Sequence, residues 1–521
     1  MNKTIELRLL PQEAADENLC RSRVAKQLDI QQREITAMRL VRRAIDARQR
    51  QVMVLLTFDV YVGEEPKEEA LSEMPGYKDV RSAQPVVVVG AGPGGLFAAL
   101  RLIELGLRPI VVERGKDVST RKIDLAQLQR SHTVDPESNY AFGEGGAGTY
   151  SDGKLFTRST KRGNVRKILE TFVHHGAQRD ILIDAHPHIG TDVLPYVIKK
   201  MRETIIENGG VVHFQAKVVD LLSNGDAIKG VKLADGHTIE ANAVILATGH
   251  SARDVYEMLN SKGLALEAKT WAMGVRVEHP QELIDELQYH MPNGRGEYLP
   301  PATYSLVAQS DGRGVYSFCM CPGGFIVPAM TADNEMVVNG MSPSRRSSPY
   351  ANSGIVVEIS PEDIGAYQNE GPLGAMHYQQ EYERLAFING GHGIVAPAQG
   401  LADFVDGRLS FELPETSYIP GVVSSPMHFW MPDNISKRLR DGFAQFDRRM
   451  RGFVTNEAMV VGVESRTSSP IRIPRDAETM CHPQMQGLYP CGEGAGFAGG
   501  IVSSAIDGEL CAEKIAQSLK N

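Results

Sequence analysis

Three glycines, Gly90, Gly92 and Gly95, follow an apolar run of four valines at the spacing G-x-G-x-x-G. In this spacing the first glycine permits a tight turn, the second lets the backbone approach a pyrophosphate, and the third lets a helix pack closely on a strand. The chemistry that the pattern predicts is phosphate binding by backbone amides at a helix N-terminus. The alternative is a parallel sheet of the same kind that binds no ligand.

The residues around these glycines predict a strand, a helix and a second strand that would position them. Val86–Val89 has the composition of a parallel strand buried on both faces, and the helix after it should end near Gly106. The second strand, residues 110–112, ends in Glu113, about 20 residues beyond the central glycine, where a carboxylate can accept hydrogen bonds from a ribose. The predicted contacts of this unit with an adenine dinucleotide are Gly90, Gly92, Pro93, Gly94, Gly95, Glu113 and Arg114.

A second glycine pattern occurs in residues 139–155, at Gly143, Gly145 and Gly148. No apolar strand precedes it, so we expect a loop whose amides reach an anion or an extended ligand, rather than a second dinucleotide fold. Polar contacts would come from neighbouring side chains, including Thr149, Asp152 and Lys154. A surface loop without a ligand is equally compatible with this stretch.

The glycine-rich residues 491–500 precede a helix that we expect over residues 501–519. Because the N-terminus of a helix carries free amides and a positive dipole, this junction suits a phosphate or an electron-rich ring oxygen. Glu493 is placed there to accept hydrogen bonds from ribityl hydroxyls. The alternative is a glycine turn that only lets the closing helix pack tightly.

Residues 271–462 predict a substrate domain of short strands with few long helices. Within it Cys319 and Cys321 are two positions apart, so in a regular strand both thiols would point to the same face. They could be a redox pair or two reduced thiols lining a pocket, although C-x-C in a strand is a strained geometry for a disulfide. We take Cys321 as a candidate catalytic residue. Arg466 is the second, because a guanidinium can hold a substrate carboxylate with two hydrogen bonds, while a structural ion pair is equally compatible.

Taken in order, these motifs resemble the FAD-binding pattern of two-dinucleotide-type flavoproteins. The glycine turn with Glu113, the loop at Gly145 and Gly146, Ala247-Thr248-Gly249 and the C-terminal YPCGEGAGFAGGI carry this resemblance. More narrowly, the N-terminal residues, FGEGGAGTYSDGKL, ATGHSARD, FCMCPGG and GVESRTSSPIR are similar over nearly the whole chain to a bacterial family of uncharacterised FAD-dependent dehydrogenases. More distantly, the arrangement is similar to flavoproteins of the fumarate reductase and geranylgeranyl reductase types, whose two-piece FAD domain carries an inserted substrate domain.

The resemblance implies FAD as the cofactor, with the first glycines at the pyrophosphate and Glu113 at the adenosine ribose. Many flavoproteins of this type have Asp where this chain has Glu493, which can still accept from a hydroxyl. Besides the contacts named above, the residues implied at the cofactor are Gly145, Gly146, Gly148, Val218, Ala247, Thr248, Gly249, Gly492, Glu493, Gly499, Gly500 and Ile501.

The length of 521 residues suggests about three domains, and 42% hydrophobic and 23% charged residues are ordinary for a globular enzyme. We expect an α/β protein whose Rossmann-like FAD-binding domain is discontinuous. The expected divisions are a small N-terminal α+β module at 1–80, the FAD-binding domain at 82–270 and 466–521, and an inserted α+β substrate domain at 271–465. The net charge of −9 argues against a chain built to coat nucleic acid or an anionic membrane.

No stretch approaches 18 apolar residues, the N-terminus lacks a signal-peptide core, and six cysteines form no regular framework. These features predict a cytoplasmic protein with reduced thiols and no membrane span. The histidines between residues 174 and 188 follow no zinc spacing, so we expect no metal.

The function that we expect is that of an FAD-dependent oxidoreductase, a dehydrogenase or reductase acting on an unidentified small molecule. No second Rossmann fingerprint is present for a nicotinamide, so NAD(P)H would have to donate electrons without a dedicated domain. One alternative is an FAD-dependent RNA-modifying enzyme, in which the arginines between residues 33 and 50 grip RNA. The other is a protein that binds FAD without turnover.

Overall fold

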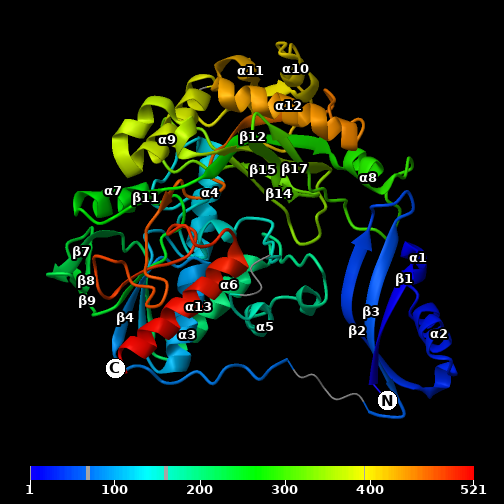
Figure 1. The fold of residues 1–521 in the computed structure, drawn as a ribbon, viewed down its shortest axis with the longest axis horizontal. Helices are drawn as coiled ribbons and strands as arrows, with labels where there is room; N and C mark the ends of the chain where they lie inside the picture. The colour runs from blue at the N-terminus through cyan, green and yellow to red at the C-terminus, as the bar shows by residue number, and fades with distance from the viewer. Residues whose placement is uncertain (1, 66–70, 158–161, 392, 521) are drawn as a thin grey trace.

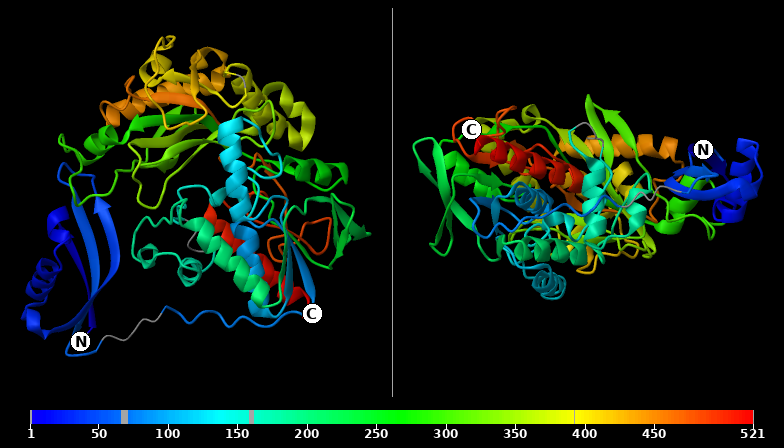
Figure 2. Two further views of the ribbon diagram at one scale, coloured as in Figure 1. Left: turned by 180° about the vertical axis from the view of Figure 1, so that it is seen from behind. Right: turned by 90° about the horizontal axis from the view of Figure 1, so that it is seen from below.

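The computed structural model describes residues 2–65, 71–157, 162–391 and 393–520. The chain forms a small N-terminal module, a domain built on a parallel sheet, and a third part built on a large mixed sheet that lies over the second (Figure 1). The expected N-terminal division includes residues 66–70, which lie outside the described residues. Residues 71–84 then run as an extended strap to the first strand of the parallel sheet (Figures 1 and 2).

The N-terminal module is a three-stranded antiparallel sheet in the order β1-β3-β2, with two helices packed on one face. Its elements are β1 (Asn2–Leu9), α1 (Pro11–Ala14), α2 (Glu17–Leu28), β2 (Ile35–Asp46) and β3 (Met53–Val62). Alternate residues of β3, such as Leu56 and Phe58, are buried against Val24 of α2 and form a core of their own.

Among the arginines between residues 33 and 50, Arg43 and Arg48 already have acidic partners. Arg43 pairs with Asp184 at 2.8 Å and with Asp180 at 3.0 Å, both in the parallel-sheet domain, and Arg48 pairs with Asp46 at 2.8 Å. Arg43 therefore fastens the module to its neighbour, and part of the positive charge that suggested RNA binding serves ion pairs within the chain.

The parallel sheet has the order β22-β10-β4-β5-β6, and every neighbouring pair in it is parallel. Its strands are β4 (Pro85–Val89), β5 (Arg108–Val112), β6 (Val211–His213), β10 (Val244–Leu246) and β22 (Leu488–Pro490). Val86–Val89 are all buried, as expected for a central parallel strand. The strand from the end of the chain completes a sheet that begins 400 residues earlier, because Leu488 pairs with Val244 beside Val87.

Helices cover one face of this sheet, and a small antiparallel sheet with one helix covers the other. On the first face lie α3 (Pro93–Leu105), α5 (Val165–His174), α6 (Leu194–Glu207) and α13 (Ile501–Ser518). On the second lie β7 (Val218–Asn224), β8 (Ala227–Leu233), β9 (Thr238–Glu240) and α7 (Arg253–Ser261). Helix α4 (Val118–Ser131) contacts α6 and buries Leu125 and Leu128 in the core of the mixed-sheet part. Helices α3 and α13 cross closely, since a Cβ on Gly508 would lie 2.0 Å from the Gly94 carbonyl oxygen.

The large mixed sheet has seven strands in the order β13-β14-β17-β12-β20-β18-β19. These are β12 (Trp271–Pro280), β13 (Val307–Ser310), β14 (Arg313–Cys321), β17 (Tyr350–Ile359), β18 (Ala396–Gly400), β19 (Val422–Ser424) and β20 (Met459–Glu464). The helices of this part are α8 (Gln281–Tyr289), α9 (Gly374–Ile388), α10 (Leu401–Asp406), α11 (Met427–Trp430) and α12 (Asp433–Arg449). Two of these helices, α9 and α12, are long, in agreement with the expectation of few long helices, and α12 buries Ile435, Leu439, Phe443 and Phe446 at helical spacing. The central strands are longer than expected, because β12 and β17 have 10 residues each.

Short elements complete the described chain. They are the hairpin β15 (Phe325–Pro328) and β16 (Val338–Met341), the pair β11 (Glu267–Ala268) and β21 (Ile471–Arg472), and the 3₁₀ turns η1 (Gln32–Glu34), η2 (Gly146–Gly148), η3 (Arg179–Leu182), η4 (Pro361–Asp363) and η5 (Gly365–Leu373). Among the described residues no helix is both long and apolar enough to cross a membrane. The predicted fold class is confirmed: a Rossmann-like α/β domain in two sequence pieces, a mixed-sheet substrate domain and an N-terminal module.

Candidate functional site

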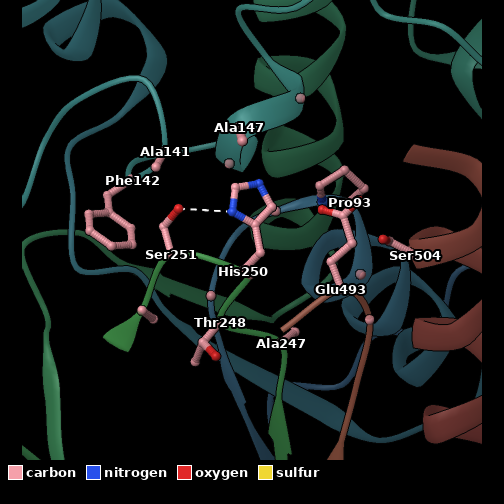
Figure 3. Close-up of a pocket in the computed structure, with 18 of the residues that line it drawn as sticks. Pro93, Ala141, Phe142, Ala147, Ala247, Thr248, His250, Ser251, Glu493 and Ser504 are labelled. Atoms are coloured by element: carbon pink, nitrogen blue, oxygen red, sulfur yellow. Dashed lines mark hydrogen bonds between the residues drawn. The ribbon is translucent and has the colours of Figure 1, made fainter. Parts of the chain in front are cut away.

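A cavity lies at the carboxyl ends of β4, β5 and β10, and the start of α13 and strand β14 close its other side. We call it the central cavity; Figure 3 shows part of its lining. The predicted site residues that line it are Gly90, Gly92, Pro93, Gly94, Glu113, Arg114, Gly146, Gly148, Asp152, Lys154, Val218, Ala247, Thr248, Gly249, Arg466, Gly492, Glu493, Gly499, Gly500 and Ile501. Gly95, Gly145, Thr149 and Cys321 do not line it.

The first wall is the turn between β4 and α3. A Cβ on Gly95 would lie 1.9 Å from the Gly90 carbonyl oxygen, and a Cβ on Gly90, which has φ +104°, would lie 2.3 Å from the Ala247 carbonyl oxygen. Both positions therefore need glycine for backbone packing. Gly92 has an ordinary φ of −75°, and a Cβ there would meet only the Gly146 Cα, at 3.9 Å. Helix α3 begins after it without a side-chain cap, so its first amides face the cavity.

Glu113 ends β5 and joins two loops. Its carboxylate accepts hydrogen bonds from the amides of Ala91 at 2.9 Å, Gly115 at 2.9 Å and Gly143 at 3.0 Å. A carboxylate offers about four acceptor positions, so one remains toward the cavity. The neighbouring Arg114 uses three of its five N–H donors in ion pairs with Glu137 and Asp254.

The glycine loop at residues 143–148 is held from behind by Arg121 of α4, which sequence reasoning did not identify. Its fully buried guanidinium donates to the carbonyls of Asn139, Tyr140, Glu144 and Gly146 at 2.8–3.0 Å. Burial lowers the pKa of Arg121 to about 10. Gly145 and Thr149 belong to this loop but do not line the cavity. The Thr149 hydroxyl donates to the Glu144 carbonyl at 3.0 Å and so stabilises the loop conformation.

Asp152 and Lys154 continue the same loop toward the mixed sheet. Asp152 is buried between Arg346, at 2.9 Å, and Lys154, at 3.0 Å, and these cations hold its pKa well below the usual range. Lys154 also donates to the Met320 carbonyl of β14. The loop therefore ties the parallel-sheet domain to the strand that closes the far side of the cavity.

The end of β10 presents small residues and one imidazole to the cavity. The Thr248 hydroxyl is buried without a hydrogen-bond partner in the described chain, and His250 Nδ1 lies 2.9 Å from the Ser251 hydroxyl (Figure 3). Burial lowers the pKa of His250 to about 4, so the ring is neutral at pH 7. Its position in the cavity lining, where Figure 3 draws the ring between Ala147 and Pro93, was not predicted, although the sequence places it directly after Gly249.

The last wall is the glycine-rich segment before α13. The Gly492 amide donates to Asp507 at 2.8 Å, and Asp507 in turn pairs with Arg475 at 2.6 Å. Helix α13 begins at Ile501 without a side-chain cap on Gly500. Asp507 also lies near Cys491 and Cys511, and the oxygen and sulfur atoms of these three residues that could bind a metal are within 4.8 Å of one another. However, the Asp507 carboxylate already accepts from Arg475 and from the Gly492 amide. These contacts favour a structural role over a metal site.

The residues around the central cavity fit an adenine dinucleotide that carries a flavin. Two uncapped helix N-termini, of α3 and α13, suit its phosphates and ring oxygen. A Cβ on Gly249, Gly499 or Gly500 would meet nothing within 4 Å, so the backbone there leaves open space that a ligand can approach. The buried Thr248 hydroxyl has no hydrogen-bond partner among the described residues, so it is available to a ligand in the cavity.

Arg466 lines the cavity but is held in a buried network. It donates to Glu383 through Nε at 3.0 Å and Nη2 at 2.9 Å, to Glu335 at 2.7 Å and to Thr331 at 2.7 Å. Arg253 contacts the same two glutamates. Four of the five N–H donors of Arg466 thus have protein acceptors, which favours the structural ion pair over the substrate anchor; the anchor stays a prediction.

We expect Arg466→Ala to lower the free energy of unfolding by about 3 kcal/mol at pH 7, because it strips Glu383 of its bidentate partner inside the protein. Urea unfolding followed by circular dichroism measures the loss. Arg384→Ala removes an arginine that is 61% exposed and paired with Glu381, and should change stability by less than about 0.5 kcal/mol. An Arg466→Ala protein of unchanged stability would refute the structural role.

Glu493 differs from the other acids of the cavity, because its carboxyl has no hydrogen-bond partner among the described residues. Burial raises its pKa to about 7, against the opposing charge of Lys269. An acid whose folded pKa lies above its unfolded value stabilises the fold most at low pH, and this contribution is lost as pH rises through the folded pKa.

For FAD-free protein, we therefore expect the stability difference between Glu493→Gln and wild type to grow by up to about 2 kcal/mol between pH 5 and pH 8, in favour of the variant. Urea midpoints across this range measure it. Glu478→Gln, on an exposed side chain, should show the same pH profile as wild type. A parallel pair of profiles for wild type and Glu493→Gln would show that the carboxyl titrates normally.

The two cysteines do not follow the alternation expected of a strand. β14 loses register with β17 between Phe318 and Cys321, and Cys319 adopts φ +47° inside the bulge. Cys319 lines the central cavity, whereas Cys321 is fully buried behind it. The bulge therefore places Cys319 in the cavity lining and Cys321 outside it, and a catalytic role for Cys321 stays a prediction.

Comparison with known families identifies the class of protein. Residues 83–252 match the family model of an FAD binding domain, and residues 270–467 match that of an FAD-dependent protein, C-terminal domain-like. Residues 1–61 match a domain of unknown function. The chain is therefore an FAD-binding flavoprotein, and the cofactor prediction is confirmed.

The family follows from a relative of the same length. An "Uncharacterized protein" of Clostridium beijerinckii is 39% identical over an alignment that covers 96% of each chain. The chain belongs to the family that this relative represents, that of FAD-dependent proteins with this C-terminal domain.

Solved structures resemble the chain at low overall similarity. Tetracycline destructase Tet(51) has 11% identity and a TM-score of 0.35, with 84% of this chain and 83% of that one covered. A geranylgeranyl bacteriochlorophyll reductase-like protein of Thermoplasma acidophilum has 14% identity, a TM-score of 0.34, and coverage of 84% and 80%. A flavoprotein/dehydrogenase of Cytophaga hutchinsonii has 13% identity, a TM-score of 0.35, and coverage of 84% and 79%. Scores at this level carry no argument about this chain.

Proposed function

We propose that the protein is an FAD-dependent oxidoreductase that transfers a hydride or electrons between the flavin and a small molecule. The observation that carries this proposal is a second, smaller cavity, the side cavity, which shares lining residues with the central cavity at the end closed by the mixed sheet. The shared residues include Ala147, His250 and Arg466. The side cavity is narrow, so a substrate would occupy the adjoining end of the central cavity and project into the side cavity, next to the cofactor rather than at the adenosine end.

The lining of the side cavity indicates the kind of substrate that it suits. Tyr140, Tyr150 and Val327 supply aromatic and apolar surface, and the neutral imidazole of His250 supplies a hydrogen-bonding group. Glu464, on the same wall, has its pKa raised to about 7 by burial even though Arg276 pairs with it at 2.9 Å. A carboxyl with such a pKa can take up or release a proton near neutral pH.

The roles of the chain follow from these positions. FAD, when bound, supplies the hydride or electron chemistry. Gly92, Gly146 and the first turn of α13 would hold the phosphates and the ring, Glu113 would accept from the adenosine ribose, and Glu493 would accept from the ribityl chain. The mixed sheet excludes water from the end of the cavity where the substrate would lie.

The test begins with purified protein mixed anaerobically with NADH, NADPH or dithionite, followed by the flavin absorption band. The proposal expects bleaching by dithionite and by a physiological donor, and return of the band with an electron acceptor. Candidate substrates are then screened for spectral shifts, with His250→Ala as the variant that should weaken them. A flavin that dithionite bleaches but that no donor or acceptor ever exchanges electrons with would favour a protein that binds FAD without turnover.

A further inference from the structure

Cys319 and Cys321 form a thiol pair with unequal access at the substrate end of the central cavity. Cys319 lines the cavity, and Cys321 is 0% exposed beneath it. The bulge in β14 brings Cys321 Sγ to 3.2 Å from the Cys319 carbonyl oxygen, instead of leaving the thiols on a regular strand. One thiol can therefore meet a ligand, and the other can meet only its neighbour.

Two cations surround this three-residue segment. Arg276, which is fully buried, donates through Nη2 to the Cys319 carbonyl at 2.7 Å and lies 3.4 Å from Cys321 Sγ. Lys154 donates to the carbonyl of Met320, between the two cysteines. Arg276 and Lys154 thus fix the backbone of the bulge from two domains and place positive charge next to both sulfurs.

We propose that Cys319 and Cys321 are a redox-active dithiol, in which Cys319 attacks a small hydroperoxide that enters the central cavity and Cys321 resolves the product into an intramolecular disulfide. The inference does not rest on the proposed function, because neither step needs turnover of the flavin.

The electrostatics of the pair agree with this division of roles. The neighbouring Cys321 side chain, together with Lys154 and Arg276, lowers the pKa of Cys319 against the effect of burial. The neighbouring Cys319 side chain and burial raise the pKa of Cys321. The accessible thiol is thus the more acidic of the two, as in thiol pairs where one cysteine attacks and the second resolves.

Both steps balance without a further co-reactant. In the first, an S–O bond forms between the Cys319 thiolate and the hydroperoxide, the O–O bond breaks, and the leaving oxygen takes a proton to become water or an alcohol; the sulfur is oxidised by two electrons to a sulfenic acid. In the second, Cys321 sulfur attacks Cys319 sulfur, its thiol proton joins the departing hydroxyl, and water leaves as the disulfide forms. An added dithiol reverses the oxidation.

The size of the reactant is limited by where Cys319 lies. It shares the cavity wall with Glu493 and Gly500, so a bound cofactor occupies most of the adjoining space. A hydroperoxide of few atoms can still reach the sulfur, whereas a bulky disulfide would have to displace the cofactor.

The experiment treats FAD-loaded protein with a slight excess of hydrogen peroxide and follows it by intact mass and by peptide mapping without reductant. We expect wild type to lose 2 Da as the Cys319–Cys321 disulfide forms. Cys321→Ser should instead gain about 16 Da at Cys319 and react with dimedone, because the sulfenic acid has no resolving thiol. Cys319→Ser should show neither change.

Cys481→Ser is the matched control, because Cys481 is the other partly exposed cysteine and lies outside the cavity lining. It should behave as wild type, at a rate within about twofold. Wild type that keeps both thiols free, or Cys319→Ser that oxidises at the wild-type rate, would overturn the proposal. The flavin absorption band, recorded in each sample, separates this outcome from failure of the oxidoreductase proposal.

Discussion

Gly92→Val should yield a folded protein that purifies without its yellow colour. The backbone at Gly92 has φ −75°, which a valine tolerates, and a Cβ there would meet only the Gly146 Cα, at 3.9 Å. The branched side chain would therefore be accepted by the fold but would stand where the phosphates approach the N-terminus of α3. We expect the Kd for FAD to rise by about 100-fold or more.

Titration of FAD-free protein with FAD, by flavin fluorescence or calorimetry, measures this loss, and circular dichroism verifies the fold. Gly76→Ala, in the strap before β4, is the matched control, because a Cβ there would meet nothing within 4 Å. Gly92→Val that binds FAD as wild type does would place the phosphates somewhere other than the start of α3.

Arg121→Met should cost stability and cofactor affinity together. The substitution keeps a long side chain but removes the guanidinium donors of four carbonyls between residues 139 and 146. Thr149 still donates to the carbonyls of Glu144 and Gly146, whereas those of Asn139 and Tyr140 lose their only donor among the described residues. Unsatisfied groups of this kind cost about 1–3 kcal/mol each, part of which the loop recovers by relaxing, so we expect a loss of about 3 kcal/mol. Because the relaxed loop no longer presents Gly146 to the cavity, FAD should bind at least about tenfold more weakly.

Urea unfolding of the FAD-free and FAD-loaded proteins distinguishes the two effects, since the stability added by saturating FAD reports affinity. Lys122→Met, one residue along α4 on an exposed side chain, should leave both quantities unchanged. If Arg121→Met lost stability without losing affinity, the loop would be a scaffold element with no contact to the cofactor.

The Rossmann unit was predictable because each of its signals is local. Val86–Val89, the glycines after it and Glu113 each follow from neighbours within a single strand-turn-helix-strand segment, and the structure places them as expected. The C-terminal helix was expected for the same reason, and it ends at Ser518, one residue before the predicted Leu519.

The features that sequence reasoning missed depend on contacts between distant segments. The sequence around Arg121 is that of an ordinary helical arginine, and its role depends on a loop about 20 residues further along the chain. The burial of Arg466 likewise depends on Glu383 and Glu335, which lie far from it in the sequence. Cys319 rather than Cys321 lines the cavity because of one extra residue in the pairing of β14 with β17, which shifts side chains between faces. The types and spacing of the residues in this strand do not predict such a bulge.

The order of strands in the parallel sheet has a consequence for how the protein is made. Strand β22 and helix α13, which close the sheet and the central cavity, are the last described elements to leave the ribosome, and they must pair with β10 and pack on α3, both synthesised far earlier. Until then the nascent chain exposes an unpaired edge at β10 and the bare face of α3. We therefore expect FAD to bind only after these residues have been translated, and a polypeptide truncated before Leu488 to bind chaperones rather than FAD.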